Sequence, residues 1–437
     1  MTFYLTDVCL LTLLSLTAIL LVWSLRKPPT RKVFKQLIKR PMAACSGLVL
    51  MFFLIVGIVD SIHITGTSKT VDAADTLLDV FLSPLGDVYE KTYSEPLALK
   101  SFSSEIRINN GVMQQVYPSL KYPHHLFRSE SDKIQWLSQV ILKDLLSVFL
   151  FMLIIGGAWF HWSRPKQSTL FWSVLLTGFI LLSLVVITYH ISRSLHVLGT
   201  GKIGQDVFYT TVKSIRTGLV IGLLTTLFMM PLALLLGITA GYFGGLIDDI
   251  IQFVYTTLSS IPGVLLITAS VLSLQTYMAN HPDYFSTMAK SADARLLALC
   301  FILGITSWTS LCRVLRAETL KLRELDYIQA AHALGSSHWT IITKHMLPNV
   351  MPIVLITLVL DFSFLVLAEA VLSYVGVGVS PTTISWGNMI NGARLELARE
   401  PVVWWPMFAA FFAMFGLVLA SNLFADAVRD VLDPHNV

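Results

Sequence analysis

The stretch TGLVIGLLTTLFMMPLALLLGITAGYFGGLI, residues 217–247, contains no Asp, Glu, Lys or Arg. It exceeds the roughly 20 apolar residues that an α-helix needs to cross a bilayer. Further stretches without these charged residues occupy residues 42–59, 145–162, 167–192, 250–282 and 401–425. This pattern predicts several membrane-spanning helices, because a helix satisfies its own backbone hydrogen bonds inside lipid.

The composition supports the same conclusion. Of 437 residues, 54% are hydrophobic and only 13% are charged, whereas a soluble domain carries about 25% charged residues. A soluble protein would have to place all these stretches in one core, and single cores stop growing near roughly 250–300 residues. We therefore expect an all-α membrane protein, a polytopic helical bundle of about nine spans. The expected spans are residues 4–25, 42–61, 139–162, 168–190, 212–240, 249–275, 294–313, 349–373 and 403–425.

The positions of the basic residues predict an orientation. Residues 26–40 hold seven Lys or Arg and no acid, which is typical of a cytoplasmic loop. The long mixed loop that follows is then extracytoplasmic, and Arg164 and Lys166 return to the cytoplasm. Alternation places residues 314–348 and the C-terminus in the cytoplasm. The run at residues 8–25 is expected to be a retained helix and not a cleaved signal. Topology also explains the net charge of +4, so nucleic acid is not an expected partner.

Gly and Pro interrupt the spans from about residue 196 onward, as in helices that pack tightly within a transporter. We therefore predict two regions. Residues 1–195 form an N-terminal extension with about four spans and an extracytoplasmic insert at about 62–138. Residues 196–437 form a transport core that contains a cytoplasmic loop at about 314–348.

That cytoplasmic loop contains the most informative sequence, YIQAAHALGSSHWTIITKHMLPN, which begins at Tyr327. Small residues precede Gly335, which is expected to end a short helix. A second amphipathic piece follows, and Pro348 stands where a new helix can start. Small residues allow close approach to a partner, so a short helix here would suit docking into a groove of a soluble protein. An interfacial helix lying on the membrane is the alternative, and the residues alone do not separate the two.

The same stretch resembles the EAA loop of ABC importer permeases, with the pattern E-A-A-x-x-x-G and a later L-P. The residues in register are Gln329, Ala330, Ala331, Gly335, Leu347 and Pro348. Gln329 replaces the family's Glu and loses its charge. The resemblance implies that this segment is a coupling helix that docks in a cleft of an ATPase subunit.

Other segments extend the resemblance over about residues 196–435. Residues 198–206 are similar to the L-G-T-D-x-x-G-R-D segment of dipeptide and oligopeptide permeases, with Gly199, Thr200, Gly204 and Asp206 in agreement. Gly201 and Gln205 replace an acid and a base. Similar matches occur at residues 240–248, 367–373, 385–389 and 426–434. The order of these motifs resembles an ABC type I importer permease core, specifically the C-type subunit of the dipeptide/oligopeptide/nickel family.

The resemblance implies a subunit that is not itself an enzyme and has no catalytic residue. It implies a heterodimer with a second permease in the lipid of a bacterial inner membrane, two ABC ATPase subunits and an extracytoplasmic binding protein. ATP and Mg would bind to the ATPase partners, since this chain has no Walker motif. The expected substrate is a di- or oligopeptide moved by alternating access.

Nickel or another small solute is an alternative substrate. An ion-gradient-driven secondary transporter and a sensory protein with the insert as receptor are alternative classes. The four cysteines lie in or at the end of apolar stretches and form no CxxC pair, so no metal site or cofactor is expected in this chain.

Asp361 and Glu369 lie within an otherwise apolar expected span. Charged residues in such a place are costly and are usually functional. Eight residues along a helix separate them by about 80°, so both could face one interior. They are candidates for the substrate pathway or for contact with the partner permease. Local pairing or a position near the outer surface are the structural alternatives.

Overall fold

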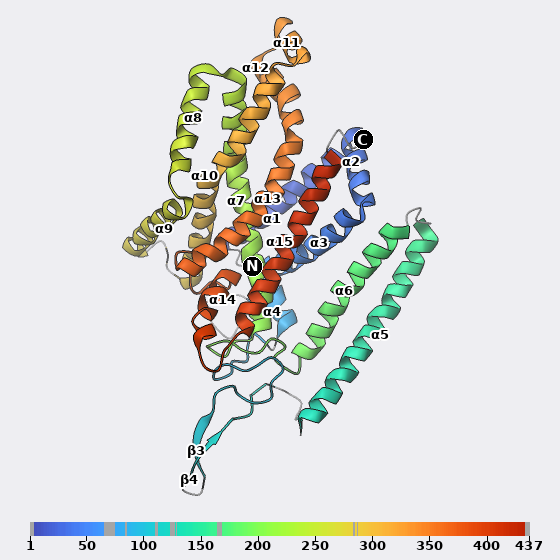
Figure 1. Cartoon of the computed structure of the whole chain (residues 1–437), viewed down its shortest axis with the longest axis vertical. Helices are drawn as coiled ribbons and strands as arrows, with labels where there is room; N and C mark the ends of the chain where they lie inside the picture. The colour runs from blue at the N-terminus through green and yellow to red at the C-terminus, as the bar shows by residue number, and fades with distance from the viewer. Residues whose placement is uncertain are drawn as a thin grey trace. The chain divides into compact units, whose positions relative to one another are not determined.

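The computed structural model describes residues 4–64, 75–83, 85–109, 112–122, 127, 129–163, 168–282, 285 and 287–432. The longer helices are α1 (Leu5–Leu25), α2 (Pro28–Lys39), α3 (Pro41–Ser61), α5 (Glu130–Ser163), α6 (Ser168–Ser192), α7 (Val207–Phe243), α8 (Gly245–Ser260), α9 (Gly263–Asn280), α10 (Met288–Arg323), α13 (Leu347–Val375) and α15 (Trp405–Leu432). The shorter ones are α4 (Leu77–Leu82), α11 (Asp326–Ala333), α12 (His338–Ile341) and α14 (Trp386–Ala393). Figure 1 shows this mainly helical chain. Nine helices within the described residues are long and apolar enough to cross a membrane, which confirms the predicted fold class.

The helices divide between two compact units, and each is described by itself. Unit 1 comprises residues 1–2, 38–217 and 384–420, and unit 2 comprises residues 3–37, 218–383 and 421–437. Unit 1 thus contains the expected insert together with the first residues of the expected transport core. The functional boundary between residues 195 and 196 stays a prediction.

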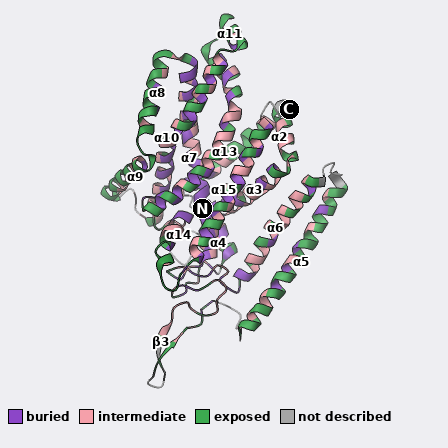
Figure 2. Cartoon of the chain, in the orientation of Figure 1, coloured by how far each residue is buried: buried purple, intermediate pink, exposed green. Residues whose placement is uncertain are grey.

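In unit 1, α6 packs against both α5 and α3. Helices α5 and α6 carry large exposed apolar side chains, including Leu142, Ile154 and Trp172. Figure 2 shows α5 largely in green and α6 in a mixture of pink and green. A long apolar helix with an uncovered face is suited to contact with lipid. The segments between α3 and α5 contain two small antiparallel sheets. Strands β1 (His63–Ile64) and β2 (Asp75–Thr76) pair, and β3 (Glu105–Asn109) pairs with β4 (Val112–Val116).

In unit 2, α7, α10 and α13 build the core with help from α1. One buried cluster contains Leu10 of α1, Leu224 of α7, Leu303 of α10 and Leu365 of α13. A Cβ at Gly237 would lie 2.8 Å from the Cβ of Leu315, so the missing side chain is what allows α7 to approach α10 closely. Close approach through small residues is common between helices in membranes.

The structure corrects the predicted span at 249–275. Two helices replace it, because α8 ends at Ser260 and α9 begins at Gly263. Pro262 stands between them, and a proline cannot donate the hydrogen bond that would continue α8. Figure 1 shows α9 leaving α8 in a different direction. The span predicted at 294–313 is also longer than expected, since α10 extends to Arg323 and carries the first basic residues of the expected loop.

Candidate coupling site

The predicted end of a short helix at Gly335 is confirmed. Helix α11 ends at Ala333, and Gly335 has a φ of 78°. The Gly335 N–H donates to the carbonyl of His332 at 3.0 Å, and the Ser336 N–H donates to Ala331 at 3.1 Å. These two bonds form a Schellman motif, which needs a residue in the left-handed region and therefore favours glycine. The chain leaves α11 in a sharp, hydrogen-bonded turn.

A second helical segment begins directly after this turn. Ser337 caps it, since its Oγ accepts the N–H of Thr340 at 3.3 Å. The segment continues through α12 and a π-helical turn, Ile342–Met346, into α13. Pro348 lies in the first turn of α13, as predicted, but no loop precedes it. Since Pro348 has no N–H to donate to the preceding turn, local adoption of π geometry accommodates it.

The inner side of this segment is anchored to the end of α7. Ile328, Ile341 and Met346 are almost fully buried and cluster with Tyr242 of α7. The Tyr242 hydroxyl also forms a 2.8 Å hydrogen bond with Nδ1 of His338. Ala331 packs against this cluster. One predicted coupling residue therefore contributes to the anchor and not to the outer surface.

The outer side of α11 is exposed. Gln329, Ala330 and Gly335 are exposed, and Leu334 at the tip is 86% exposed. Figure 2 shows this exposed end of α11 in green. The Gln329 side chain donates to the carbonyl of Glu324 at 3.2 Å. The uncharged side chain at this position is therefore held by its own chain.

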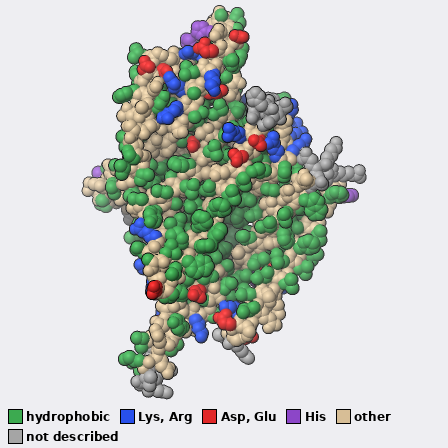
Figure 3. Space-filling model, in the orientation of Figure 1, with side chains coloured by type: hydrophobic (Ala, Val, Ile, Leu, Met, Phe, Trp, Pro, Cys, Tyr) green, Lys and Arg blue, Asp and Glu red, His purple; other side chains and the backbone are tan. Residues whose placement is uncertain are grey.

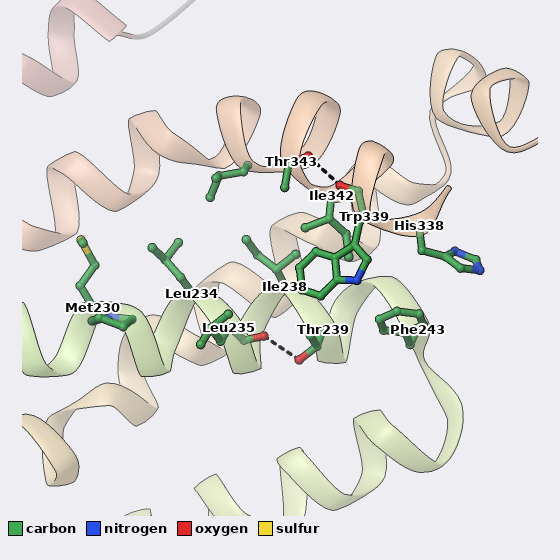
Figure 4. A pocket seen from close by; sticks show the side chains of 12 residues that line it. Met230, Leu234, Leu235, Ile238, Thr239, Phe243, His338, Trp339, Ile342 and Thr343 are labelled. Carbon is green, nitrogen blue, oxygen red and sulfur yellow. Dashed lines mark hydrogen bonds between the residues drawn. The ribbon is translucent and has the colours of Figure 1, made fainter. Parts of the chain in front are cut away.

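A groove of about 470 Å³ lies between α7 and the segment that follows α11. Figure 4 shows Leu234, Leu235 and Ile238 of α7 on one side and Trp339 and Ile342 on the other. Trp339 lines the groove and is 72% exposed, so the groove is open to the surroundings at this side chain. The lining is mainly apolar, and the hydrogen bond between Tyr242 and His338 joins the same two segments.

Asp361 and Glu369 both lie on α13 but in different surroundings. Glu369 is 3% exposed, and its Oε1 accepts a hydrogen bond from Ser373 at 2.8 Å. Asp361 is half-buried. Glu369 has the local partner that the structural alternative expected, whereas a pathway role for either residue stays a prediction.

Comparison with known proteins identifies the family. Residues 233–436 match the model of the binding-protein-dependent transport system inner membrane component. The chain is 32% identical over 242 residues to the glutathione transport system permease protein GsiD of Pectobacterium atrosepticum, which covers 55% of this chain and 73% of that protein. It is 31% identical over 239 residues to the oligopeptide transport system permease protein OppC of Mycobacterium bovis, covering 55% and 76%. The dipeptide transport system permease protein DppC of Lactococcus lactis is 28% identical over 239 residues, covering 55% and 64%.

The chain belongs to this permease family. It is an inner-membrane permease subunit of an ABC importer in the dipeptide/oligopeptide family, as the sequence motifs predicted. Its family role is that of a membrane component and not of an enzyme. Among the described residues, no group of three or more His, Cys, Asp or Glu is arranged to hold a metal ion.

The second motif of the permease, residues 198–206, is packed inside unit 1. Gly199 and Gly204 have positive φ values of 68° and 76°. A Cβ at Gly204 would collide with the backbone of Glu90, and one at Gly199 with the carbonyl of Ser94. The Thr200 N–H donates to Ser94 at 3.1 Å. Three of the four predicted residues of this motif therefore fit the backbone of residues 90–94 in the insert.

Asp206 fulfils two structural roles in the permease. Its Oδ1 accepts the N–H of Tyr209 at 2.8 Å and so caps the start of α7. Its Oδ2 lies 2.6 Å from Nδ1 of His196, and Nε2 of the same imidazole lies 3.8 Å from Oε1 of Glu90. Burial of His196 opposes protonation, but the two carboxylates outweigh it and raise its pKa to about 9. The protonated imidazole therefore links the insert to the first turn of the core.

Sequence patterns did not identify Glu90 or His196 as partners of Asp206, nor Tyr242 as an anchor for the segment after α11. Glu90 and Asp206 are 116 residues apart in the chain, so no local spacing relates them. A second ion pair also joins distant segments: Lys213 Nζ lies 2.5 Å from Oδ1 of Asp79. Burial opposes ionisation of Asp79, yet Lys213 holds the pKa of this carboxyl below its ordinary value. Two predicted features lie outside the described residues. They are the basic turn at Arg164 and Lys166 and the end of the last motif at Asp433 and Pro434.

Proposed function

We propose that this permease moves di- or oligopeptides across the inner membrane, coupled to ATP hydrolysis by separate ATPase subunits. The printed names of its relatives support this substrate class, since they are permeases for glutathione, dipeptides and oligopeptides. The extracytoplasmic binding protein and the ATPases follow from the family. ATP and Mg bind to the ATPases, a second permease completes the pathway, and the C-terminus is cytoplasmic.

The exposed tip of α11 carries the proposal for coupling. A leucine that is 86% exposed at the end of a tightly capped helix has no intramolecular packing role. A buried leucine contributes about 1.5–3 kcal/mol relative to an exposed one, so insertion of Leu334 into a partner's cleft would stabilise docking. The flanking Ala330 and Gly335 present little side-chain bulk and permit the close approach.

The helical segment beyond α11 would transmit movement from the docked end to α13. Residues His338–Val375 form one helical segment of 38 residues, which at 1.5 Å per residue is about 57 Å long. A push on its docked end would tilt the part that carries Asp361 and Glu369. The π turn at Ile342–Met346 is a place where this helix can bend, because its hydrogen-bond pattern already departs from α geometry.

The docking is tested by co-purification of the ATPase from detergent-solubilised membranes with Leu334→Asp. We expect at least about 30-fold less bound ATPase, as for a residue central to an interface. Leu395→Asp is the matched control, since Leu395 is 73% exposed outside this segment. ATPase that remains fully bound to a folded Leu334→Asp protein would contradict the proposed docking.

The substrate class needs a separate measurement. Uptake of radiolabelled di- and oligopeptides is compared between cells with and without this permease, and labelled nickel is measured in parallel. Peptide uptake that depends on the permease is the expected result. Permease-dependent uptake of nickel alone would refute the peptide assignment without affecting the coupling proposal.

A further inference from the structure

Helix α2 combines a strongly basic face with an apolar face. It follows Arg26 and Lys27 and precedes Arg40, and residues 26–40 contain no acid among their seven basic residues. We propose that α2 is an interfacial helix that binds the headgroups of anionic phospholipids at the bilayer surface. This inference depends on α1 and α3 being spans and does not require the proposed substrate.

The two faces of α2 follow from helical spacing. At about 100° per residue, Val33, Phe34, Leu37 and Ile38 fall on one side of the helix. The opposite side carries Arg31, Lys32, Lys35 and Lys39, all of which are exposed. Phe34 is 36% exposed and Ile38 is 49% exposed, so the chain itself does not cover the apolar face fully. Such an arrangement is typical of helices that lie in the membrane interface.

The connection between α1 and α2 is ordered. The Thr30 hydroxyl donates to the carbonyls of Ser24 and Lys27, and the Lys27 N–H donates to Ser24 at 2.9 Å. Lys27 Nζ also lies 4.1 Å from the centre of the Trp23 ring. Tryptophan and lysine at the end of a span are typical of the level of the headgroups. The start of α2 is therefore held at that level.

The neighbouring elements leave α2 little freedom to move away from the bilayer. Helix α1 is an apolar helix of spanning length that ends at Leu25, and the equally apolar α3 begins at Pro41. A helix of 12 residues between two spans must stay close to the surface where they emerge. Figure 3 shows blue basic side chains gathered where Figure 1 places α2.

Charge complementarity identifies the partner. A leaflet that contains anionic lipid attracts basic residues by about 1 kcal/mol each when they lie near its surface. The exposed apolar side chains would enter the boundary between headgroups and acyl chains at the same time. An acidic protein surface would satisfy the basic face but would leave Phe34 and Ile38 without the lipid boundary that suits them.

Helix α1 connects the proposed lipid contact of α2 to the transport core. Leu10 of α1 is 1% exposed and packs in the same cluster as Leu296, Leu299 and Leu303 of α10. Helix α10 continues to Arg323, and only two residues separate it from the start of α11 at Asp326. Anionic lipid bound to α2 would therefore restrain α10, the helix that leads into α11.

The test measures hydrogen exchange of α2 amides in the full-length permease, assembled with its partner subunits in nanodiscs. One set of discs contains phosphatidylcholine alone, and the other contains phosphatidylcholine with phosphatidylglycerol. We expect at least about fivefold slower exchange in the anionic discs, corresponding to the attraction of a single basic residue. The difference should shrink at high salt, because exposed charges are then screened.

Matched variants assign the effect to α2. Lys32→Ser/Lys35→Ser should reduce the difference, and Lys32→Arg/Lys35→Arg should retain it. Lys100→Ser/Lys290→Ser removes two exposed lysines elsewhere and should behave as wild type. Equal exchange in both lipid compositions would overturn the proposal. Protection that follows the presence of the ATPase and not the lipid would instead assign the basic face to a protein partner.

Discussion

The two motif-bearing segments of this permease differ in what surrounds their signature residues. In the outer segment, residues 198–206, Gly204 lies against the Glu90 backbone and Asp206 is fully buried. In the coupling segment, residues 327–348, Gln329 and Ala330 are exposed, and a Cβ at Gly335 would meet only open space. Intramolecular packing accounts for the outer segment. It does not account for the outward residues of the coupling segment, so contact of these residues with a partner stays our prediction.

The largest difference is expected between two glycine-to-alanine substitutions. Gly204→Ala combines a left-handed backbone with a collision, and each contributes about 1–3 kcal/mol, so we expect about 4 kcal/mol of destabilisation. Gly335→Ala has the same backbone strain without the collision and should cost about 1 kcal/mol. Thermal unfolding of both variants in detergent measures the difference. Equal losses would show that the two segments are constrained alike.

The pH dependence of unit 1 is the next largest effect. The folded pKa of His196 is about 9, above its ordinary value of 6.5. Its stabilising contribution is therefore complete below pH 6.5 and is lost as the pH rises through 9, with a size of about 3 kcal/mol. The thermal midpoint of the wild type should fall across this range. His196→Gln should be less stable at pH 6.5 and should lack this fall, and an identical fall in the variant would refute the role of His196.

A smaller effect is expected from bulk on the outer face of α11. Ala330→Leu adds a side chain to an exposed position, so the unfolding temperature should stay nearly unchanged. Association with the ATPase should weaken about tenfold, because the added bulk prevents close approach. Ala331→Leu is the counterpart, since Ala331 packs against the buried anchor. It should lower stability by about 1–3 kcal/mol. Binding measurements and melting curves distinguish the two effects. Loss of stability in Ala330→Leu together with loss of ATPase binding in Ala331→Leu alone would contradict the two assignments.

The smallest effect concerns the anchor beneath the coupling segment. Tyr242→Phe keeps the aromatic ring but removes the 2.8 Å hydrogen bond to His338. A bond of this kind contributes about 1 kcal/mol. Faster hydrogen exchange at residues 338–346 should report the loss, while exchange in the outer segment stays unchanged. An equal change in both segments would contradict the local role of this anchor.

The sequence predicted the number of spans and both motif segments because their signals are local. A charge-free run such as residues 217–247 has to become a helix in lipid whatever packs beside it. Gly335 was identified as a helix end because its left-handed conformation serves the turn formed by its own neighbours. The break between α8 and α9 was missed, since the apolar run continues through Pro262 and hydropathy does not register a change of direction.

Sequence alone thus determined the membrane class, the family and the helix end at Gly335, because each depends on residues that are close together in the chain. Tertiary structure decided which side of each motif is free. Ala330 and Ala331 are neighbours of the same type, yet one is exposed and the other packs against the cluster around Tyr242. His196, Glu90 and Asp206 form one charged cluster only because folding brings the insert to the start of α7. Long-range contacts of this kind leave no periodic trace in a single sequence.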